Sequence, residues 1–138
     1  MKEKGSILKL FIADDSPVVV ERLIAMLSEI PEIKIVGQAQ KPLEAINSIQ
    51  RLKPDAVILD IRLREGSGID VLQSIKKDNP ALLVIILTNY PYPQYRKKCM
   101  DAGADFFFDK STEFEKITKV FKKLISDSSK RSEPNTRG

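Results

Sequence analysis

Residues 10–17 read LFIADDSP, an apolar run followed by two adjacent carboxylates and a serine–proline pair. A short run rich in large and β-branched apolar residues is typical of a strand that is buried on both faces of a sheet. Ser16 and Pro17 are typical of a helix start, with the serine as the N-terminal cap and the proline in the first turn. This stretch predicts a strand that leads directly into a helix, with Asp14 and Asp15 in the connection.

Apolar runs of the same kind recur along the chain, and helical patterns lie between them. The runs span residues 7–13, 33–39, 56–60, 82–88 and 104–108. In the first intervening segment, Val20, Leu23 and Leu27 recur at the spacing of one helix face. Strand and helix therefore alternate five times, with connections too long for hairpins. This order predicts an α/β fold in which a doubly wound, five-stranded parallel sheet is covered by five helices.

Prolines and composition mark the expected boundaries. Pro42 is placed to begin the second helix, and Pro91 and Pro93 should delay or shorten the fourth. The last helix is expected from residue 112 to about residue 125. The chain then divides into an N-terminal extension, one folded domain and a flexible tail without large apolar side chains, at residues 1–6, 7–125 and 126–138.

The composition narrows the class of protein. A chain of 138 residues with 42% hydrophobic residues has room for one domain with its own core. No window is apolar enough for a membrane span and the N-terminal segment does not resemble a secretory signal, so a cytoplasmic location is expected. Cys99 has no cysteine or histidine partner for a disulfide or a zinc site. The net charge of +4 is spread over expected helix faces and the tail, so direct nucleic-acid binding is not expected.

Polar residues fall at the ends of the predicted strands. In an open parallel sheet, ligands bind beyond the carboxyl ends of the strands, where the strand order reverses. A single aspartate at such an end is ordinarily a turn or cap residue, but several polar residues at one edge predict a site. The residues at these ends are Asp14, Asp15, Asp60, Thr88 and Lys110.

The charges at this edge require a cation. Two carboxylates about 5 Å apart repel each other by roughly 3 kcal/mol at an effective dielectric constant near 20. Lys110 supplies one positive charge, and a hard divalent ion with oxygen ligands, such as Mg²⁺, would supply the rest. The absence of histidine and cysteine from this set argues against zinc or copper.

Five segments of the sequence resemble the site segments of response regulator receiver domains of two-component systems, in matching order and spacing across residues 7–125. They are LFIADDSP, VILDIRL, SGIDVL, VIILTN and ADFFFDKS. The resemblance implies a flavodoxin-like sheet with strand order 2-1-3-4-5, which is the order of the chemotaxis receiver.

The resemblance also implies roles for the residues at the strand ends. Asp60 would be the phosphoacceptor, taking a phosphoryl group from the phosphohistidine of a sensor histidine kinase or phosphotransfer protein, and later losing it to water. Asp15 and Asp60, with the backbone carbonyl of Arg62, would hold Mg²⁺, and Asp14 would act through a coordinated water molecule. Lys110 would cover the phosphoryl oxygens, since positioning and charge neutralisation dominate phosphoryl transfer.

The remaining implied roles concern the response to phosphorylation. The Thr88 hydroxyl would donate to a phosphoryl oxygen and draw the end of its strand inward. Phe107 occupies the position of the family's switch aromatic, and a downstream protein would bind the face formed by the fourth helix, fifth strand and fifth helix. By strand alternation Phe106 and Phe108 should face away from Phe107, which leaves a simple core role for Phe107 as the alternative.

The sequence departs from the family pattern at three positions near the site. Arg64 replaces the usual proline in the loop after the phosphoacceptor, and Asn89 replaces a small residue beside the threonine. Ser111 replaces the proline that often follows the lysine. The first change should loosen a loop, and the second should alter the rates of phosphorylation or hydrolysis.

Three functions fit these observations to different degrees. The first is a stand-alone receiver that works by partner docking or as a phosphorelay component, not as an enzyme on other substrates. The second is a truncated receiver half of a helix-turn-helix transcription regulator, because such receivers often share the Lys-Ser pair and the DIRL string. The third is a flavodoxin-like nucleotide binder or a small hydrolase. The paired carboxylates at residues 14 and 15 would repel a nucleotide phosphate, and Arg62 stands where an aspartyl-phosphate hydrolase needs a second acid.

Overall fold

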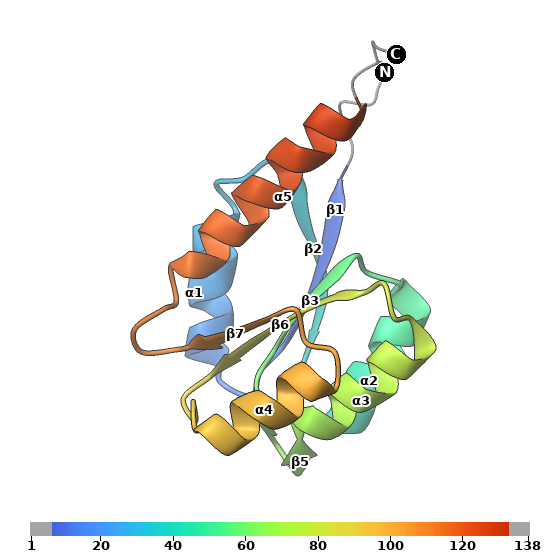
Figure 1. Ribbon diagram of the computed structural model, residues 1–138, viewed down its shortest axis with the longest axis vertical. Helices are drawn as coiled ribbons and strands as arrows, with labels where there is room; N and C mark the ends of the chain where they lie inside the picture. Colours follow the sequence, from blue (N-terminus) through green and yellow to red (C-terminus); the bar gives the residue numbers. More distant parts are fainter. Residues whose placement is uncertain (1–6, 133–138) are drawn as a thin grey trace.

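The computed structural model of the chain describes residues 7–132, with the backbone alone for residues 129–132. Its main sheet has five parallel strands in the order β2-β1-β3-β6-β7, which confirms the predicted order 2-1-3-4-5 (Figure 1). The strands are β1 (Leu8–Ala13), β2 (Ile33–Ala39), β3 (Ala56–Leu59), β6 (Leu83–Thr88) and β7 (Phe106–Asp109).

Helices cover both faces of this sheet, as the alternation of patterns predicts (Figure 1). One face packs against α1 (Pro17–Leu27) and α5 (Lys116–Ser132). The other face packs against α2 (Pro42–Leu52), α3 (Gly68–Asp78) and α4 (Pro93–Asp101). Alternate residues of each strand enter the two cores: Phe11 of β1 lies with α2 and α3, and its neighbour Ile12 lies with α1 and α5. None of the described helices combines the length and apolar character that a bilayer span requires.

The helix starts follow the predicted signals. Ser16 caps α1, its hydroxyl accepting a hydrogen bond from the Val19 N–H at 3.3 Å, and Pro17 occupies the first turn. Pro42 begins α2, although Lys41 before it makes no side-chain cap. Pro93 begins α4, which is only nine residues long, so the two prolines around Tyr92 do delay this helix.

The fifth helix differs from its predicted limits at both ends. It begins at Lys116 rather than residue 112, because residues 109–113 form a hydrogen-bonded turn. It continues to Ser132 rather than ending near residue 125, because no glycine or proline interrupts residues 116–132 and each added residue gains a backbone hydrogen bond. The predicted tail therefore begins too early at residue 126. Its remainder at residues 133–138, and the predicted extension at residues 1–6, lie outside the described residues.

A small hairpin after β3 was not predicted. It pairs β4 (Arg62–Leu63) with β5 (Gly66–Ser67) in antiparallel fashion. Glu65 in its turn has a positive φ of 66°. Strands of two residues are too short to show an alternating pattern in the sequence. The hairpin leads directly into α3, so it connects the end of β3 to the start of a helix.

Candidate functional site

The predicted site residues lie at the carboxyl ends of the central strands. The register places the last residue of β1, Ala13, beside Leu59 of β3, so that Asp14 and Asp60 follow neighbouring strands. The Asp60 N–H donates to the Ala13 carbonyl at 3.0 Å, which continues the sheet by one residue. Thr88 pairs with Asp109 at the ends of β6 and β7, and Lys110 follows. The polar residues that follow strands remote in the sequence thus lie together at the carboxyl edge of the sheet.

Three carboxylates form a cluster at this edge. One carboxylate oxygen from each of Asp14, Asp15 and Asp60 lies within 4.8 Å of the others. Asp14 is 1% exposed and Asp60 is 5% exposed, while Asp15 is the least buried of the three. A set of oxygen ligands at this spacing fits a hard divalent cation such as Mg²⁺ and provides no soft ligand. The chemistry of the donor set therefore agrees with the metal predicted from the sequence.

Lys110 joins two of these carboxylates. Its ammonium group lies 2.8 Å from Asp14 Oδ2 and 2.9 Å from Asp60 Oδ2, and the Lys110 side chain is 6% exposed. The Lys110 backbone N–H donates to the Thr88 carbonyl at 2.8 Å, which fixes the lysine beside the end of β6. A buried ammonium with two carboxylate partners is strongly oriented, because each charged hydrogen bond is shorter and stronger than a neutral one.

Burial and the ion pair act in opposite directions on the ionisation of this site. Burial raises the pKa of the Asp60 carboxyl above its ordinary value, although the nearby charge of Lys110 acts to lower that pKa. Burial also acts to lower the pKa of Lys110, but the hydrogen bonds and charges of Asp14 and Asp60 outweigh it, so this pKa is raised. Lys110 is therefore a permanent cation at neutral pH, facing a carboxylate that is costly to keep ionised.

Gly68 allows α3 to begin against the backbone of Asp60. A Cβ atom at position 68 would stand 1.8 Å from the Asp60 carbonyl oxygen, so only glycine fits at this close approach. The Gly68 N–H also donates to the Ile61 carbonyl, and the Ser67 hydroxyl caps α3 by accepting from the Ile69 N–H at 3.0 Å. The segment SGID thus supports the loop that carries Asp60.

Tyr90 contacts both Thr88 and Arg62 beside the site. The Thr88 hydroxyl is fully buried and accepts a hydrogen bond from the Tyr90 N–H at 2.9 Å. A hydroxyl that accepts one bond retains its own hydrogen for donation. The Arg62 guanidinium lies over the Tyr90 ring, 4.3 Å from its centroid, and the Arg62 N–H is 3.4 Å from Asp60 Oδ1. The sequence did not indicate this side-chain contact, because it joins two loops whose relative placement depends on the fold.

Phe107 packs beneath α4. Its ring is 3% exposed in the core that contains Cys99, and the Arg96 guanidinium covers it at 4.7 Å. Phe106 and Phe108 face the other core and stack with centroids 5.8 Å apart, as strand alternation predicts. Cys99 is a buried free thiol, and burial raises its pKa to about 11.

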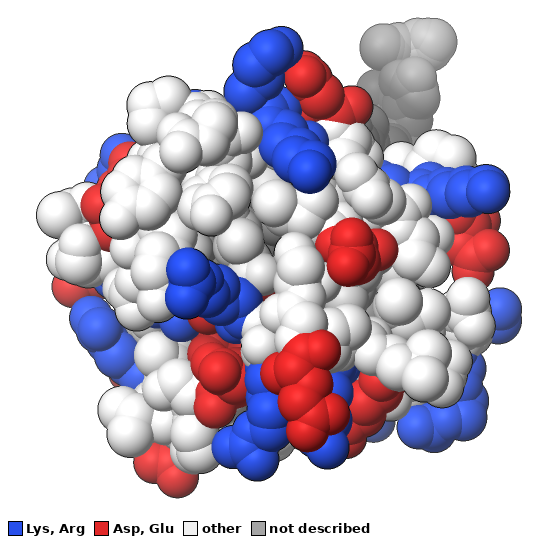
Figure 2. All heavy atoms as spheres, turned by 90° about the horizontal axis from the view of Figure 1, so that it is seen from below, with Lys and Arg blue, Asp and Glu red and all other residues white. Residues whose placement is uncertain are grey.

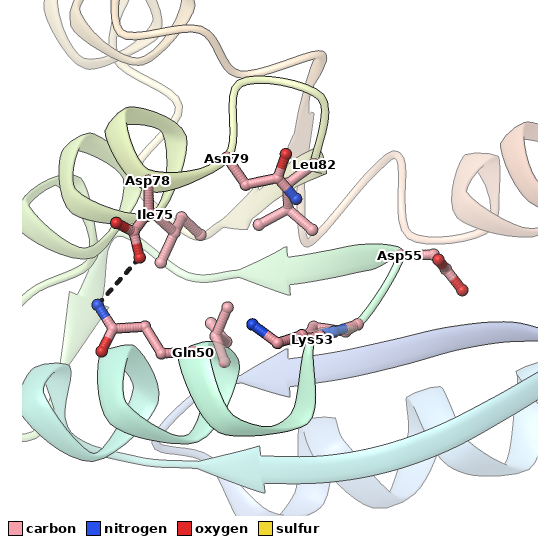
Figure 3. A pocket seen from close by; sticks show the side chains of 9 residues that line it. Gln50, Lys53, Asp55, Ile75, Asp78, Asn79 and Leu82 are labelled. Atoms are coloured by element: carbon pink, nitrogen blue, oxygen red, sulfur yellow. Dashed lines mark hydrogen bonds between the residues drawn. The ribbon is translucent and has the colours of Figure 1, made fainter.

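The surface around the site mixes both signs of charge. Figure 2 shows the end of the molecule at which the strands finish, with acidic and basic groups interspersed among uncharged side chains. A cavity of about 690 Å³ lies instead at the opposite edge of the sheet, between the ends of α2 and α3 (Figure 3). On its rim, Gln50 donates to Asp78 at 3.1 Å. This cavity contains none of the predicted site residues.

A model of the response regulator receiver domain family matches residues 10–122 of the chain. The chain belongs to this family. Response regulators are components of two-component signalling systems, and their receiver domains carry an acidic pocket of the kind described above. The resemblance noted in the sequence and its predicted fold are therefore confirmed.

Similar proteins include longer regulators. The uncharacterized transcriptional regulatory protein YvfU of Bacillus subtilis is 30% identical over 118 residues, which are 86% of this chain and 59% of YvfU. The DNA-binding transcriptional activator DevR/DosR of Mycobacterium tuberculosis is 31% identical over 114 residues, which are 83% of this chain and 52% of that protein. This receiver chain thus spans little more than half the length of these relatives.

Among solved structures, the complex of CheX with CheY, BeF3 and Mg²⁺ from Borrelia burgdorferi gives a TM-score of 0.75 at 25% identity. The match covers 86% of this chain and 92% of that chain. The receiver fold of the present chain is therefore shared over nearly all of the described residues.

Proposed function

We propose that this receiver is a phosphorylation-dependent switch whose phosphoacceptor is Asp60. The observation that carries the proposal is the pairing of a buried carboxylate and a buried ammonium, Asp60 Oδ2 and Lys110 Nζ, 2.9 Å apart beside two further carboxylates. A buried acid with a raised pKa and a specific charged partner is a candidate for a reactive group.

The donor is the phosphohistidine of a sensor histidine kinase or of a phosphotransfer protein. An Asp60 carboxylate oxygen attacks the phosphorus atom, a P–O bond forms, and the P–N bond to the imidazole breaks with its electron pair returning to the nitrogen. The ammonium of Lys110 neutralises negative charge on the phosphoryl oxygens as they approach, which is the main task of a protein in phosphoryl transfer. A water oxygen later attacks the phosphorus atom, the P–O bond to Asp60 breaks, and inorganic phosphate leaves as the Asp60 carboxylate is restored.

A Mg²⁺ ion fits the same site. Asp15, Asp60 and the backbone carbonyl of Arg62 are the proposed ligands, and Asp14 acts through a coordinated water molecule. When bound, the ion neutralises charge shared by the carboxylates and the phosphoryl oxygens. Lys110 contacts Oδ2 of both Asp14 and Asp60, and Asp14 Oδ1 accepts a hydrogen bond from the Ser16 N–H at 2.9 Å, so an ion would share these carboxylates with donors of the protein.

The proposed switch runs from Thr88 to the face formed by α4, β7 and α5. Once Asp60 carries a phosphoryl group, the Thr88 hydroxyl donates to it and moves the β6–α4 loop, which it already contacts through the Tyr90 N–H. Phe107, packed beneath Arg96 of α4, responds to that movement. A downstream protein that binds this face then distinguishes the two states.

A second candidate function follows from the relatives. The regulators YvfU and DevR/DosR are transcriptional regulatory proteins, and the matched region is 59% of the first and 52% of the second. This supports the proposal that the chain is the receiver part of a DNA-binding regulator, in which case the output is a second domain and not a separate protein. The reading frame downstream of Gly138 distinguishes the two: a continuing frame that encodes a helix-turn-helix favours the second candidate, and an immediate stop codon contradicts it.

Intact mass spectrometry tests the phosphoacceptor. Wild-type protein incubated with Mg²⁺ and acetyl phosphate is expected to gain the mass of one phosphoryl group, and Asp60→Asn is expected to gain none. A control carrying Asp101→Asn, which changes an exposed carboxylate on α4 paired with Lys97, should react like wild type. Absence of added mass on the wild type, while a known receiver reacts in parallel, contradicts the proposal.

A further inference from the structure

The loop that carries Lys110 is closed by its own side chains. Asp109 Oδ1 accepts hydrogen bonds from both the N–H and the hydroxyl of Ser111, at 2.8 and 2.7 Å. Glu113 Oε1 accepts from the Asp109 N–H at 2.9 Å, and the Glu113 N–H donates to the Asp109 carbonyl at 2.8 Å. Residues 109–113 therefore form a turn bonded in both directions, with Lys110 inside it.

The outer side of this turn is fixed to α5. Lys116, the first residue of that helix, places its ammonium 2.7 Å from Glu113 Oε2. Hydrogen bonds from Ser111 lower the pKa of Asp109, and those from Lys116 and the Asp109 N–H lower the pKa of Glu113, so both side chains are acceptors at neutral pH. The turn is thus attached to β7 on one side and α5 on the other.

This turn determines the position from which the lysine side chain extends. A lysine side chain has four rotatable bonds and loses much freedom when its ammonium is fixed on two carboxylates. Restraining the backbone at both sides of Lys110 fixes the point from which this side chain must reach Asp14 and Asp60. Ser111 makes this possible, because a proline at position 111 would lack the N–H that donates to Asp109.

We propose that Asp109, Ser111 and Glu113 are positioning residues for phosphoryl transfer, which act by holding the backbone of Lys110 so that its ammonium reaches Asp60. The inference rests on the proposed phosphorylation of Asp60 and adds to it a set of residues that do not touch the reacting atoms. Small errors in the placement of a charged group reduce rates steeply, so loosening this turn should slow the reaction without removing any reacting group.

Matched substitutions separate the hydrogen bonds from the charge. Asp109→Ala removes the acceptor for both Ser111 bonds, and Asp109→Asn retains an oxygen that can accept them. Glu113→Ala and Glu113→Gln form a second pair of the same kind and serve if Asp109→Ala fails to fold. Asp127→Ala, which removes an exposed carboxylate paired with Lys123 on α5, is the control for loss of an acidic group.

The first measurement is the rate of phosphorylation of the 138-residue chain by acetyl phosphate at saturating Mg²⁺. Asp109→Ala is expected to be about tenfold slower than wild type, while Asp109→Asn stays within about twofold. The Mg²⁺ dissociation constant should change by less than about twofold in both, because the carboxylate cluster is intact. In a Lys110→Ala background, Asp109→Ala should have no further effect on the rate, since it acts through the lysine. Equal slowing in both backgrounds overturns the proposal.

The second measurement does not depend on phosphoryl transfer. In a ¹⁵N spectrum of the lysine ammonium groups, the Lys110 resonance should shift or broaden in Asp109→Ala and return to the wild-type position in Asp109→Asn. An unchanged resonance in Asp109→Ala overturns the positioning role, even if the wild type accepts a phosphoryl group normally. If the wild type accepts none, the proposed function fails, and the resonance still decides whether this turn positions Lys110.

Discussion

At the carboxyl end of the sheet, Lys110 and its two carboxylate partners are almost fully buried. At the amino end, Lys76 and Asp105 form an ion pair that is partly exposed to solvent. The distances are similar, 2.8 and 2.9 Å for Lys110 and 3.1 Å for Lys76. Asp60 is 6% exposed in its side chain, but Asp105 is 36% exposed. Among the described residues, the buried polar or charged side chains are Asp14, Asp60, Thr88 and Lys110.

The ion pair at the amino end contributes to the stability of the fold. The buried charges at the carboxyl end instead depend on the rest of the fold to stay buried. Asp105 accepts from the Val84 N–H as well as from Lys76, so it joins α3 to the starts of β6 and β7. Buried charges at the other end give little net stability, because desolvation offsets much of their attraction. We interpret this concentration of buried charge as a feature of the proposed phosphorylation site, and the following predictions test that interpretation.

The largest expected effect is the loss of Lys110. Lys110→Met leaves two buried carboxylates without their cation and should lower the free energy of unfolding by about 3 kcal/mol in the absence of metal. Lys76→Met at the amino end should cost about 1 kcal/mol or less, since its partner remains hydrated. Urea unfolding of both variants, followed by circular dichroism, measures the difference. Equal losses in the two variants would contradict a special role for burial at the carboxyl end.

Addition of Mg²⁺ should stabilise the carboxyl end specifically. An ion that binds only the folded state adds about 2.7 kcal/mol at a hundredfold excess over its dissociation constant. The wild-type melting temperature should therefore rise with Mg²⁺, and Asp15→Asn should blunt the rise. Asp55→Asn, at the amino end beside Lys9, is the control and should respond like wild type. The same response in Asp15→Asn would place the ion elsewhere.

A glycine at each end provides a third comparison. Gly68→Ala puts a methyl group against the Asp60 carbonyl and should cost about 2 kcal/mol, because the start of α3 must move. Gly103→Ala, before β7, has space for the methyl group but a φ of 103°, and should cost about 1 kcal/mol through backbone strain alone. Thermal melts of the two variants measure which substitution is the more destabilising. Only Gly68→Ala should also slow phosphorylation, because it alone displaces the loop of Asp60.

The smallest expected effect is a gain in stability. Because burial raises the folded-state pKa of Asp60 above its unfolded value, ionised Asp60 destabilises the fold at neutral pH. Asp60→Asn should therefore raise the metal-free melting temperature at pH 7 by roughly a few degrees. The gain should shrink as the pH falls through the folded-state pKa of Asp60 and vanish below the unfolded-state pKa, where wild-type Asp60 is protonated in both states. Asp105→Asn should give no such gain, and a lower melting temperature for Asp60→Asn would refute this reasoning.

The sequence predicted the alternation of strands and helices and the starts of three helices for identifiable reasons, whereas the order of the strands in the sheet came from the resemblance to receiver domains. The strands of the sheet are apolar on both faces, and prolines at positions 17, 42 and 93 mark three helix starts. The end of α5 was wrong, because serine and lysine neither terminate a helix nor require its continuation. The hairpin of β4 and β5 was missed, because strands of two residues are too short to show an alternating pattern.

The candidate site was predictable where backbone topology alone brings residues together. Asp14, Asp60 and Lys110 each follow a strand of one sheet, so any parallel arrangement with this order gathers them. Contacts that depend on side-chain rotamers across loops were not predictable. The stacking of Arg62 on Tyr90 and the turn closed by Asp109 and Glu113 are of this kind. The proposed metal ligands and the switch role of Phe107 stay predictions.

The Cys99 thiol, on the buried face of α4, offers a way to observe motion in this receiver. With a pKa of about 11 and no exposed surface, Cys99 is almost wholly protonated and inaccessible at pH 8, so an alkylating reagent reaches it only when α4 lifts from the sheet. The rate of Cys99 alkylation therefore measures how often α4 opens in the unmodified protein. A spectroscopic label can also be attached to a new surface cysteine while Cys99 stays unreacted.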